Sequence, residues 1–439
     1  MARVQQHGRG RLRSAAAVAV GLAILAGTAP AQAAADPQAG GGIDGRALAQ
    51  RLDAVRAAGM YGAYGSVRDG HARWNGATGL ADTATGRPTT PGMRHRVGSV
   101  TKTFTAVAVL RQNAEGRIGL DRPVADYVPE LVPGERGTKV TVRMLLNHTS
   151  GIADYIAEAF PSLKAGSTRS LDDFRHRTVA PRQLIGLGTA EPQLFEPGGG
   201  WSYSNTNYLL LGEVLRKVTG RDPEEVITRD VIRRAGLRDT YFPGTDPRIK
   251  GPHARMYESF FGLIDPPRDY SDYDMTFAGT AGALVSTTAD LTTFFRALFQ
   301  GGLLPAEQLR QMRTTVPAED DGTGHPTRWG LGLLVTDTPC GPVWGHGGTV
   351  FGAGTMALTS DDGQRQYAVG FNLQKYQRMD ADGRPLPHPV DTALGELQAQ
   401  ALCPTAGGAR ITAPVPVAEP QEALLLKEVR RAASAQRPD

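Results

Sequence analysis

The 439-residue chain has only two cysteines, Cys340 and Cys403, and neither belongs to a Cys-x-x-Cys pair or lies beside clustered histidines. This scarcity gives no support to a metal site, and no cofactor motif stands out. Charged residues make up 21% of the chain and hydrophobic residues 40%, an ordinary globular composition. Collagen-like, disordered and many-span membrane classes are therefore excluded.

A long hydrophobic run is also lacking, and this matters at the N-terminus. Four arginines precede the first acidic residue, followed by the apolar run Ala15–Ala26 and an Ala-rich ending. This order predicts a secretory signal peptide over residues 1–35. The alternative, a membrane anchor, needs about 18 or more apolar residues, and this run is shorter.

Without the leader the chain has no formal net charge, because it contains 44 basic and 44 acidic residues. No nucleic-acid partner is therefore expected. Both cysteines lie in the exported part, where an isolated pair favours a disulfide between Cys340 and Cys403 over two buried free thiols. We expect a secreted protein, extracellular or cell-wall associated, with no membrane anchor after cleavage.

Hydrophobic spacing predicts an opening helix over 44–58, a hairpin over 61–78 around an Asp-Gly turn, and an apolar helix over 101–114. Strand patterns return near the C-terminus, over 331–336, 342–345, 354–359 and 366–373, before a closing helix over 390–402. Strands at both chain ends predict an α/β (α+β) fold. Its antiparallel sheet would be built from the two ends and flanked by helices.

The expected domain spans residues 36–403, with residues 121–330 as a mainly helical insert rich in Pro and Gly turns. Residues 404–439 have a different composition and predict a flexible tail, with one short helix over 422–433. That helix is too short to span a bilayer.

The first candidate site is Ser99 with Lys102, at the start of the apolar helix. Residues three apart share a helix face, so the lysine amine would lie beside the serine hydroxyl. Unpaired N–H groups at a helix start favour a developing negative charge, which suits a nucleophilic serine. Taken alone, the pattern is weak and favours a helix-capping serine and a solvated lysine.

The second candidate is Tyr203 with Asn205, just before another apolar helix predicted over 208–218. Tyr203 could shuttle a proton, and Asn205 could hold a carbonyl or the Lys102 ammonium. The alternative is a surface loop with an N-cap asparagine.

The third candidate is the glycine-rich strand His346-Gly347-Gly348-Thr349. Its glycines would let a substrate backbone approach closely. His346 would supply a cationic or hydrogen-bonding group, and the Thr349 amide an oxyanion donor. A structural or exposed histidine is the alternative.

Together the three candidates resemble the penicillin-recognising serine hydrolases, which include class C β-lactamases, D-alanyl-D-alanine carboxypeptidases and D-aminopeptidases or esterases. Their motifs, Ser-x-x-Lys, Tyr-x-Asn and Lys/His-x-Gly, occur here in that order, about 100 and 140 residues apart. The segments Arg96–Ala106, Leu145–Gly151 and Ala281–Thr287 also look like this family.

The resemblance implies that Ser99 attacks the carbonyl and that Lys102 and Tyr203 share the proton transfer. It also implies that Asn205 positions the substrate and that the Ser99 and Thr349 amides form the oxyanion hole. His346 stands where class C enzymes have a lysine, which disfavours a dedicated β-lactamase. His148 and Ser150 are expected to shape a loop near the site.

Recognition of a substrate carboxylate is less well supported. The position after His346, where relatives carry a hydroxyl, is Gly347, and residues 332–340 contain no arginine. Only the Thr349 hydroxyl remains, unless an arginine from elsewhere, such as Arg255 or Arg328, completes the pocket.

The leading hypothesis is a monomeric D-alanyl-D-alanine carboxypeptidase-like enzyme that cleaves small peptide or peptidoglycan-type substrates and is acylated by β-lactams. The missing arginine favours the alternative, a D-aminopeptidase or esterase of the same fold. A non-catalytic penicillin-binding or sensing module is a third possibility. It has no chemical need for Lys102 and Tyr203 together.

Overall fold

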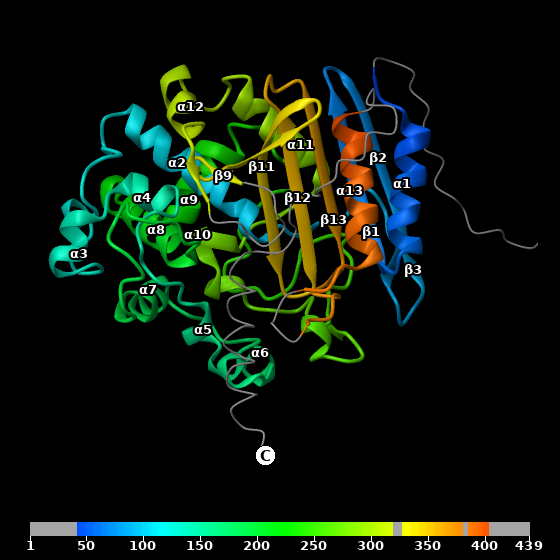
Figure 1. Cartoon of the computed structure of the whole chain (residues 1–439), viewed down its shortest axis with the longest axis horizontal. Helices are drawn as coiled ribbons and strands as arrows, with labels where there is room; N and C mark the ends of the chain where they lie inside the picture. Colours follow the sequence, from blue (N-terminus) through cyan, green and yellow to red (C-terminus); the bar gives the residue numbers. More distant parts are fainter. Residues whose placement is uncertain (1–41, 319–326, 381–384, 404–439) are drawn as a thin grey trace, which may run out of the picture. The chain divides into compact units, whose positions relative to one another are not determined.

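The computed structural model describes residues 42–318, 327–380 and 385–403 (Figure 1). The predicted leader and the predicted tail helix lie outside these residues. Within the described part, no helix is long and apolar enough to cross a membrane.

A nine-stranded antiparallel sheet runs through the described residues in the order β3-β2-β1-β13-β12-β11-β10-β9-β8. The N-terminal hairpin pairs directly with the last long strand, from Ala63↔Phe371 to Asp69↔Arg365, so the two ends of the domain meet inside one sheet. This confirms the predicted fold class. The strands of the sheet are β1 (Gly62–Asp69), β2 (Ala72–Asp82), β3 (Arg87–Pro88), β8 (Val316–Pro317), β9 (Arg328–Trp329), β10 (Leu334–Thr338), β11 (Gly341–Val350), β12 (Ala353–Ser360) and β13 (Arg365–Phe371).

Helices cover both faces of this sheet. On one face α1 (Gly45–Ala57) and α13 (Pro389–Leu402) pack side by side, and Leu52 and Leu397 share a core with Val67 of β1 (Figure 1). On the other face Thr288, which begins α11 (Thr288–Phe299), hydrogen-bonds Ser66 of β1 at 2.8 Å. The period-two alternation of β1 thus sends neighbouring residues to different cores.

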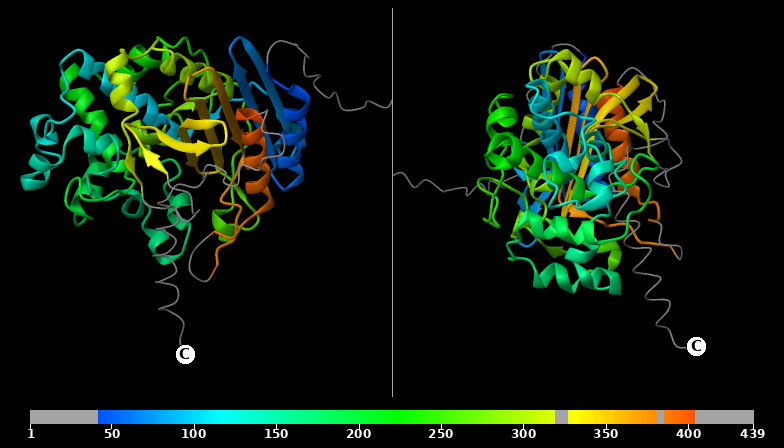
Figure 2. Two further views of the ribbon diagram at one scale, coloured as in Figure 1. Left: turned by 45° about the horizontal axis from the view of Figure 1, so that its top comes forward. Right: turned by 90° about the vertical axis from the view of Figure 1, so that its left-hand side faces the viewer.

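The remaining helices lie beyond the β11 side of the sheet, coloured cyan to yellow-green in Figures 1 and 2. Their longest members, α2 and α8, are buried on every face over residues 101–110 and 205–215, and these buried residues include polar ones such as Lys102 and Asn205. These helices are α2 (Thr101–Ala114), α3 (Gly134–Lys139), α4 (Val142–Leu146), α5 (Ile156–Ala159), α6 (Arg169–Asp173), α7 (Pro181–Ala190), α8 (Asn205–Thr219), α9 (Pro223–Ile227), α10 (Gly279–Gly282) and α12 (Ala306–Met312).

Short strands also occur among these helices. One small sheet joins β14 (Leu373–Gln374), β5 (Tyr257–Glu258) and β6 (Arg268–Asp269), and another pairs β4 (His95–Arg96) with β7 (Val285–Ser286). They are only two residues long, below the length at which a hydrophobic alternation can be recognised in a sequence.

The structure shifts two predicted boundaries near the candidate site. Strand β11 extends five residues past the predicted end at Gly345, because His346 to Val350 pair with β12 despite their glycines. Helix α8 begins at Asn205 rather than near Tyr208, after the extended residue Ser204. Both differences place candidate site residues in regular structure.

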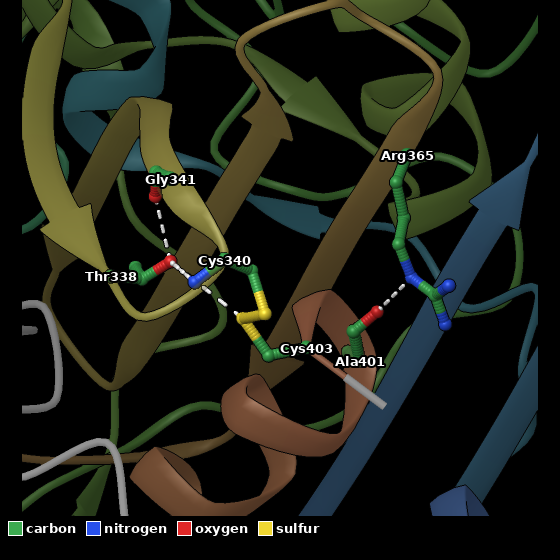
Figure 3. The surroundings of a disulfide bond; sticks show 6 residues. All are labelled: Thr338, Cys340, Gly341, Arg365, Ala401 and Cys403. Carbon is green, nitrogen blue, oxygen red and sulfur yellow. Dashed lines mark hydrogen bonds between the residues drawn. A yellow bond between two sulfur atoms is a disulfide. The ribbon is translucent and has the colours of Figure 1, made fainter. Parts of the chain in front are cut away.

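A disulfide joins Cys340 and Cys403 with their Cα atoms 5.7 Å apart, as the sequence predicts (Figure 3). Cys340 lies in the turn between β10 and β11, and Cys403 caps the C-terminus of α13. The bridge therefore ties the closing helix to the end of the strand that carries His346.

Candidate active site

Ser99 lies in a short 3-10 turn, Gly98–Val100, which leads directly into α2. Gly98 has φ 52°, and a Cβ there would lie 2.7 Å from the Thr349 nitrogen. Gly348 is equally constrained, since its Cβ would lie 2.9 Å from the Ser99 nitrogen. Only glycine at both positions allows this close approach, so the two backbones that carry the predicted oxyanion donors lie against each other.

Strand β11 leaves one edge open where the candidate residues begin. Strand β10 pairs with β11 only as far as Gly345, opposite Leu334. From His346 to Val350 the described pairing is with β12 alone. A substrate backbone could therefore lie along this edge beside Ser99.

Lys102 follows Ser99 by one helical turn and is completely buried, with 0% exposure. Its Nζ donates to Ser99 Oγ at 2.8 Å, to Asn205 Oδ1 at 2.7 Å and to the Ala281 carbonyl at 2.8 Å. An ammonium group has three hydrogens, so these acceptors match a protonated lysine. The structure thus brings together Ser99 and Lys102, as the Ser-x-x-Lys pattern predicts.

Tyr203 and Asn205 complete the group from the N-terminus of α8. The Tyr203 side chain is 2% exposed, and its ring lies 4.8 Å from Lys102 Nζ. Asn205 is the first residue of α8 and accepts the lysine hydrogen bond through its side-chain oxygen. Of the two roles left open for Asn205, the structure supports contact with the lysine.

His148 lies directly against Tyr203 rather than merely in a nearby loop. Its carbonyl accepts a hydrogen bond from Ser202 N at 3.0 Å, and its Nδ1 accepts one from Ser204 N at 3.1 Å. Its ring stacks on Tyr203 at 4.3 Å, and its φ of 65° is unusual for a residue with a side chain. Burial and the nearby Lys102 charge hold its pKa well below the usual range, so the ring is neutral.

Ser150 has a structural role. Its hydroxyl donates to Asn207 Oδ1 at 2.8 Å and accepts from Ile152 N at 3.1 Å. These bonds fix the loop that follows α4, in agreement with the expectation for this serine.

His346 is 2% exposed and faces Tyr203 and Trp329, with ring centroids 6.4 and 5.3 Å away. Burial, with the nearby Lys102 charge, lowers its pKa to about 3. The sequence left a cationic or a hydrogen-bonding role open, and near neutral pH only the second is possible. Nδ1 donates to the Gly347 carbonyl, which leaves Nε2 as an acceptor with no partner among the described residues.

Two tryptophans and one aspartate at the site were not identified from the sequence. Trp201 and Trp329, 8% and 5% exposed, pack against each other at 5.5 Å and both contact the ring of His148. Asp154 accepts from the Asn205 side chain at 2.7 Å. A possible signal was its place just after Leu145–Gly151, but an aspartate in a loop is ordinary.

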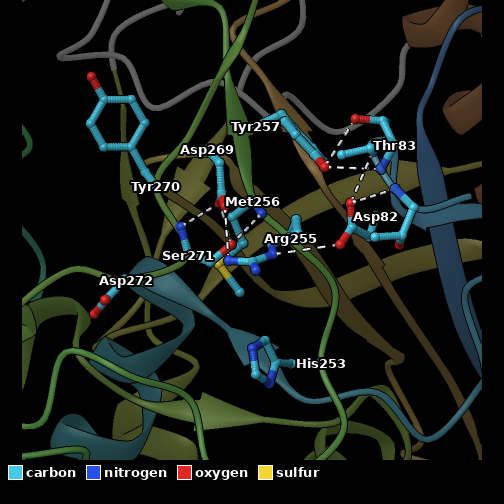
Figure 4. Close-up of polar contacts among 12 residues, drawn as sticks. Asp82, Thr83, His253, Arg255, Met256, Tyr257, Asp269, Tyr270, Ser271 and Asp272 are labelled. Atoms are coloured by element: carbon cyan, nitrogen blue, oxygen red, sulfur yellow. Dashed lines mark hydrogen bonds and ion pairs between the residues drawn. The ribbon is translucent and has the colours of Figure 1, made fainter. Parts of the chain in front are cut away.

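Neither arginine suggested for a carboxylate pocket is available. Arg255 lies between Asp82 and Asp269, with nitrogen–oxygen distances of 3.8 and 3.1 Å (Figure 4). Arg328 pairs with Asp337 at 2.8 Å. Each guanidinium is engaged by carboxylates, so neither supplies an uncompensated positive charge.

Comparison with known proteins agrees with this geometry. A family model described as Beta-lactamase matches residues 46–387. The chain is 32% identical to esterase EstB of Burkholderia gladioli, over 72% of this chain and 85% of the esterase. It is 26% identical to penicillin-binding protein 4* of Bacillus subtilis (strain 168), over 64% of this chain and 61% of that protein.

A solved structure gives a similar result. The D-stereospecific amidohydrolase from Streptomyces sp. superposes with a TM-score of 0.71 and 37% identity, over 83% of this chain and all of that one. The predicted resemblance is therefore confirmed at the level of family and fold. The match spans only about three fifths of penicillin-binding protein 4*, so the activity of that whole protein does not transfer directly.

Proposed function

Because the chain belongs to the β-lactamase family of serine hydrolases, we propose that it hydrolyses amide or ester bonds through an acyl-enzyme on Ser99. The preferred substrates are D-amino acid derivatives whose leaving group carries no free carboxylate. The names of the relatives support this class, since they include an esterase and a D-stereospecific amidohydrolase.

In this mechanism Tyr203 acts as the phenolate, and Ser99 Oγ attacks the substrate carbonyl while its proton passes to the Tyr203 oxygen. The Lys102 ammonium, held by three acceptors, stabilises the negative charge that Tyr203 carries before this transfer and that Ser99 Oγ gains during it. The Ser99 and Thr349 amides receive the oxyanion. Tyr203 then returns the proton to the leaving amine or alcohol, and a water molecule repeats the sequence to release the acid.

The observation that carries the substrate class is the neutral His346. A lysine at this position would attract a carboxylate, whereas an imidazole with a pKa of about 3 cannot. Its Nε2 accepts a hydrogen bond, which suits an amide N–H or an ammonium group of the substrate. With Gly347 adding no hydroxyl and both arginines paired, the site has little to hold a free acid.

A D-alanyl-D-alanine carboxypeptidase activity stays a prediction, as does acylation by β-lactams, and the likeness to penicillin-binding protein 4* is what favours them. Export also stays a proposal. It is supported by the Cys340–Cys403 disulfide, because such bonds persist in oxidising compartments. N-terminal sequencing of the protein from culture medium would test it.

The test compares kcat/KM for a D-Ala-D-Ala peptide acid, the matching amide and a short-chain nitrophenyl ester. We expect the amide and the ester to be cleaved at least as well as the acid, because the site lacks the charge-assisted hydrogen bond, worth roughly 1.5–3 kcal/mol, that would favour the acid by up to about a hundredfold. Gly347→Thr should raise kcat/KM for the acid relative to the amide if the strand accepts a side chain there. A preference of several thousandfold for the acid would instead establish a carboxypeptidase, and no turnover of any of the three would favour a binding module.

A further inference from the structure

Asp154 lies behind the catalytic residues and contacts them only through Asn205. Its Oδ2 accepts from Asn205 Nδ2 at 2.7 Å and from the Asn205 backbone nitrogen at 3.3 Å. Its Oδ1 accepts from Ile156 N at 2.9 Å. All three donors are neutral, so this carboxylate has no direct cationic hydrogen-bond partner among the described residues.

The chemistry of a carboxylate determines how the Asn205 amide is oriented. An ionised carboxylate only accepts hydrogen bonds, so Asn205 must present its NH₂ group to Asp154. The amide oxygen then faces the opposite way, toward Lys102 Nζ at 2.7 Å. A reversed amide would place two donors against the ammonium and an acceptor against the carboxylate, which is doubly unfavourable.

The result is an ion pair bridged by an amide, in the order Asp154, Asn205, Lys102. The pKa of Asp154 is raised overall by desolvation, which its hydrogen bonds and the Lys102 charge oppose. The other titratable groups beside these three residues are His148 and His346, both neutral through burial, Tyr208, whose pKa is raised by burial, and Tyr203. The charge of Asp154 therefore acts on Lys102 with no competing carboxylate among these groups.

We propose that Asp154 is a positioning residue that fixes the Asn205 amide and, through it, holds Lys102 as an ammonium beside Ser99. This inference rests on the acyl-enzyme mechanism proposed above. The intervening amide keeps the carboxylate from contacting the ammonium, so the charge is stabilised while Nζ still donates to the serine.

The first test variant is Asp154→Asn, assayed with the nitrophenyl ester over a range of pH. The variant removes the negative charge and lets the Asn205 amide reverse. We expect kcat/KM to fall on the order of tenfold to a hundredfold, the value of a hydrogen bond to a charged group. The alkaline limb of the pH profile should move to lower pH by on the order of one unit, because the ammonium loses a nearby negative charge.

A second variant moves the charge in the opposite direction. In the double variant Asp154→Asn/Asn205→Asp, the carboxylate contacts Lys102 directly, and the new asparagine can still donate to it. The alkaline limb should then move to higher pH. Opposite shifts in the two variants are a result that a purely structural role for Asp154 would not give.

Asp290→Asn provides the matched control. Asp290 also accepts from neutral donors, Asp239 N and Thr240 Oγ1, both at 2.8 Å, and burial also raises its pKa. This variant should leave the pH profile unchanged. Circular dichroism and thermal melting establish that each variant is folded.

The outcomes separate the two proposals. An Asp154→Asn enzyme with the wild-type rate and profile, or slower variants with no shift of the alkaline limb, would overturn the positioning role while leaving Ser99 chemistry intact. If Asp154→Asn does not fold, the double variant is the test. A shift of its alkaline limb to higher pH supports the positioning role, and the absence of that shift overturns it. A wild-type protein that turns over no substrate would instead contradict the proposed function itself.

Discussion

Among the described residues two lysines are buried, Lys102 at 0% and Lys375 at 3% exposure, and their surroundings differ. Lys375 meets a carboxylate directly, since its Nζ lies 3.2 Å from Glu258 Oε2, and the Glu258 side chain is fully buried. Lys102 meets neutral oxygens and has its carboxylate one amide away. In the direct pair, the Glu258 carboxylate neutralises the Lys375 ammonium by contact. In the bridged arrangement, the Asp154 carboxylate does not contact the Lys102 ammonium, which keeps an N–H to donate to Ser99.

The Glu258–Lys375 ion pair also holds the surrounding backbone in place. Glu258 accepts from Gly352 N at 3.0 Å, at the turn after β11, and from Phe260 N at 2.9 Å. Lys375 and Phe260 both have positive φ, 49° and 46°, which costs energy for residues with side chains. Because this ion pair holds the end of the strand that carries Thr349, we assign it to stability and Lys102 to chemistry.

Replacing the residues proposed for catalysis is the strongest test of whether Lys102 serves chemistry and Lys375 serves stability. Ser99→Ala should abolish hydrolysis and covalent labelling by a β-lactam, and Lys102→Met should lower kcat by several orders of magnitude. Lys375→Met should leave the kcat of the folded fraction unchanged. Mass spectrometry of labelled protein and active-site titration provide the measurements, and acylation retained in Ser99→Ala would exclude the mechanism.

Acid should destabilise the protein through its buried histidines. The pKa values of His95 and His346 fall to about 3 through burial, and that of His148 is also lowered. The unfolded chain binds protons below about pH 6.5 and the folded chain does not, so stability falls as pH decreases from about 6.5 toward 3.

His95 and His346 each contribute up to a few kcal/mol by pH 3, and His148 acts in the same direction. Urea unfolding at pH 7, 6 and 5 tests this before most carboxylates titrate. A free energy of unfolding that stays constant between pH 6.5 and 5 would be contrary to the burial of these rings as neutral groups.

Breaking the Glu258–Lys375 ion pair should have the next largest effect on the free energy of unfolding. Lys375→Met leaves Glu258 buried without its lysine and should cost about 3–5 kcal/mol. Replacing both charges, in Glu258→Gln/Lys375→Met, should recover part of the loss. Urea unfolding at pH 7 measures both variants, and an equally stable single variant would argue against a structural role for the pair.

Removing the disulfide should have the smallest effect on stability and no effect on kcat. The cysteines are 63 residues apart, and a native disulfide typically contributes about 2–4 kcal/mol. Cys340→Ser/Cys403→Ser should therefore lower Tm while kcat stays unchanged. Mass spectrometry of the unreduced wild-type protein is the check, and two alkylatable thiols in it would disprove the bond.

Much of the framework follows from local sequence. Helix α2 was predicted at its observed bounds because Thr101–Ala114 contains no Gly or Pro and is apolar on most sides. The disulfide followed from a single pair of cysteines. The Ser-x-x-Lys and Tyr-x-Asn patterns could be read because each lies within one turn at the start of a helix, where spacing fixes geometry.

The surroundings of these motifs could not be predicted in the same way. The ring of His148 contacts Tyr203 across 55 positions of sequence, and Trp329 reaches His346 from a two-residue strand. No periodicity marks such pairs, because they depend on where separate elements dock. The neutral state of His346 is likewise a consequence of burial rather than of its neighbours in sequence.

The sequence by itself determined which side chains come together at the proposed site and that the first and last long strands of the described residues share one sheet, since these depend on local spacing and alternation. Only the tertiary structure decided their electrostatic states. It placed Asp154 one amide away from Lys102, kept His346 neutral and engaged Arg255 with Asp82 and Asp269. The physical reason is that charge interactions depend on distance and desolvation in space, which folding sets and sequence separation does not.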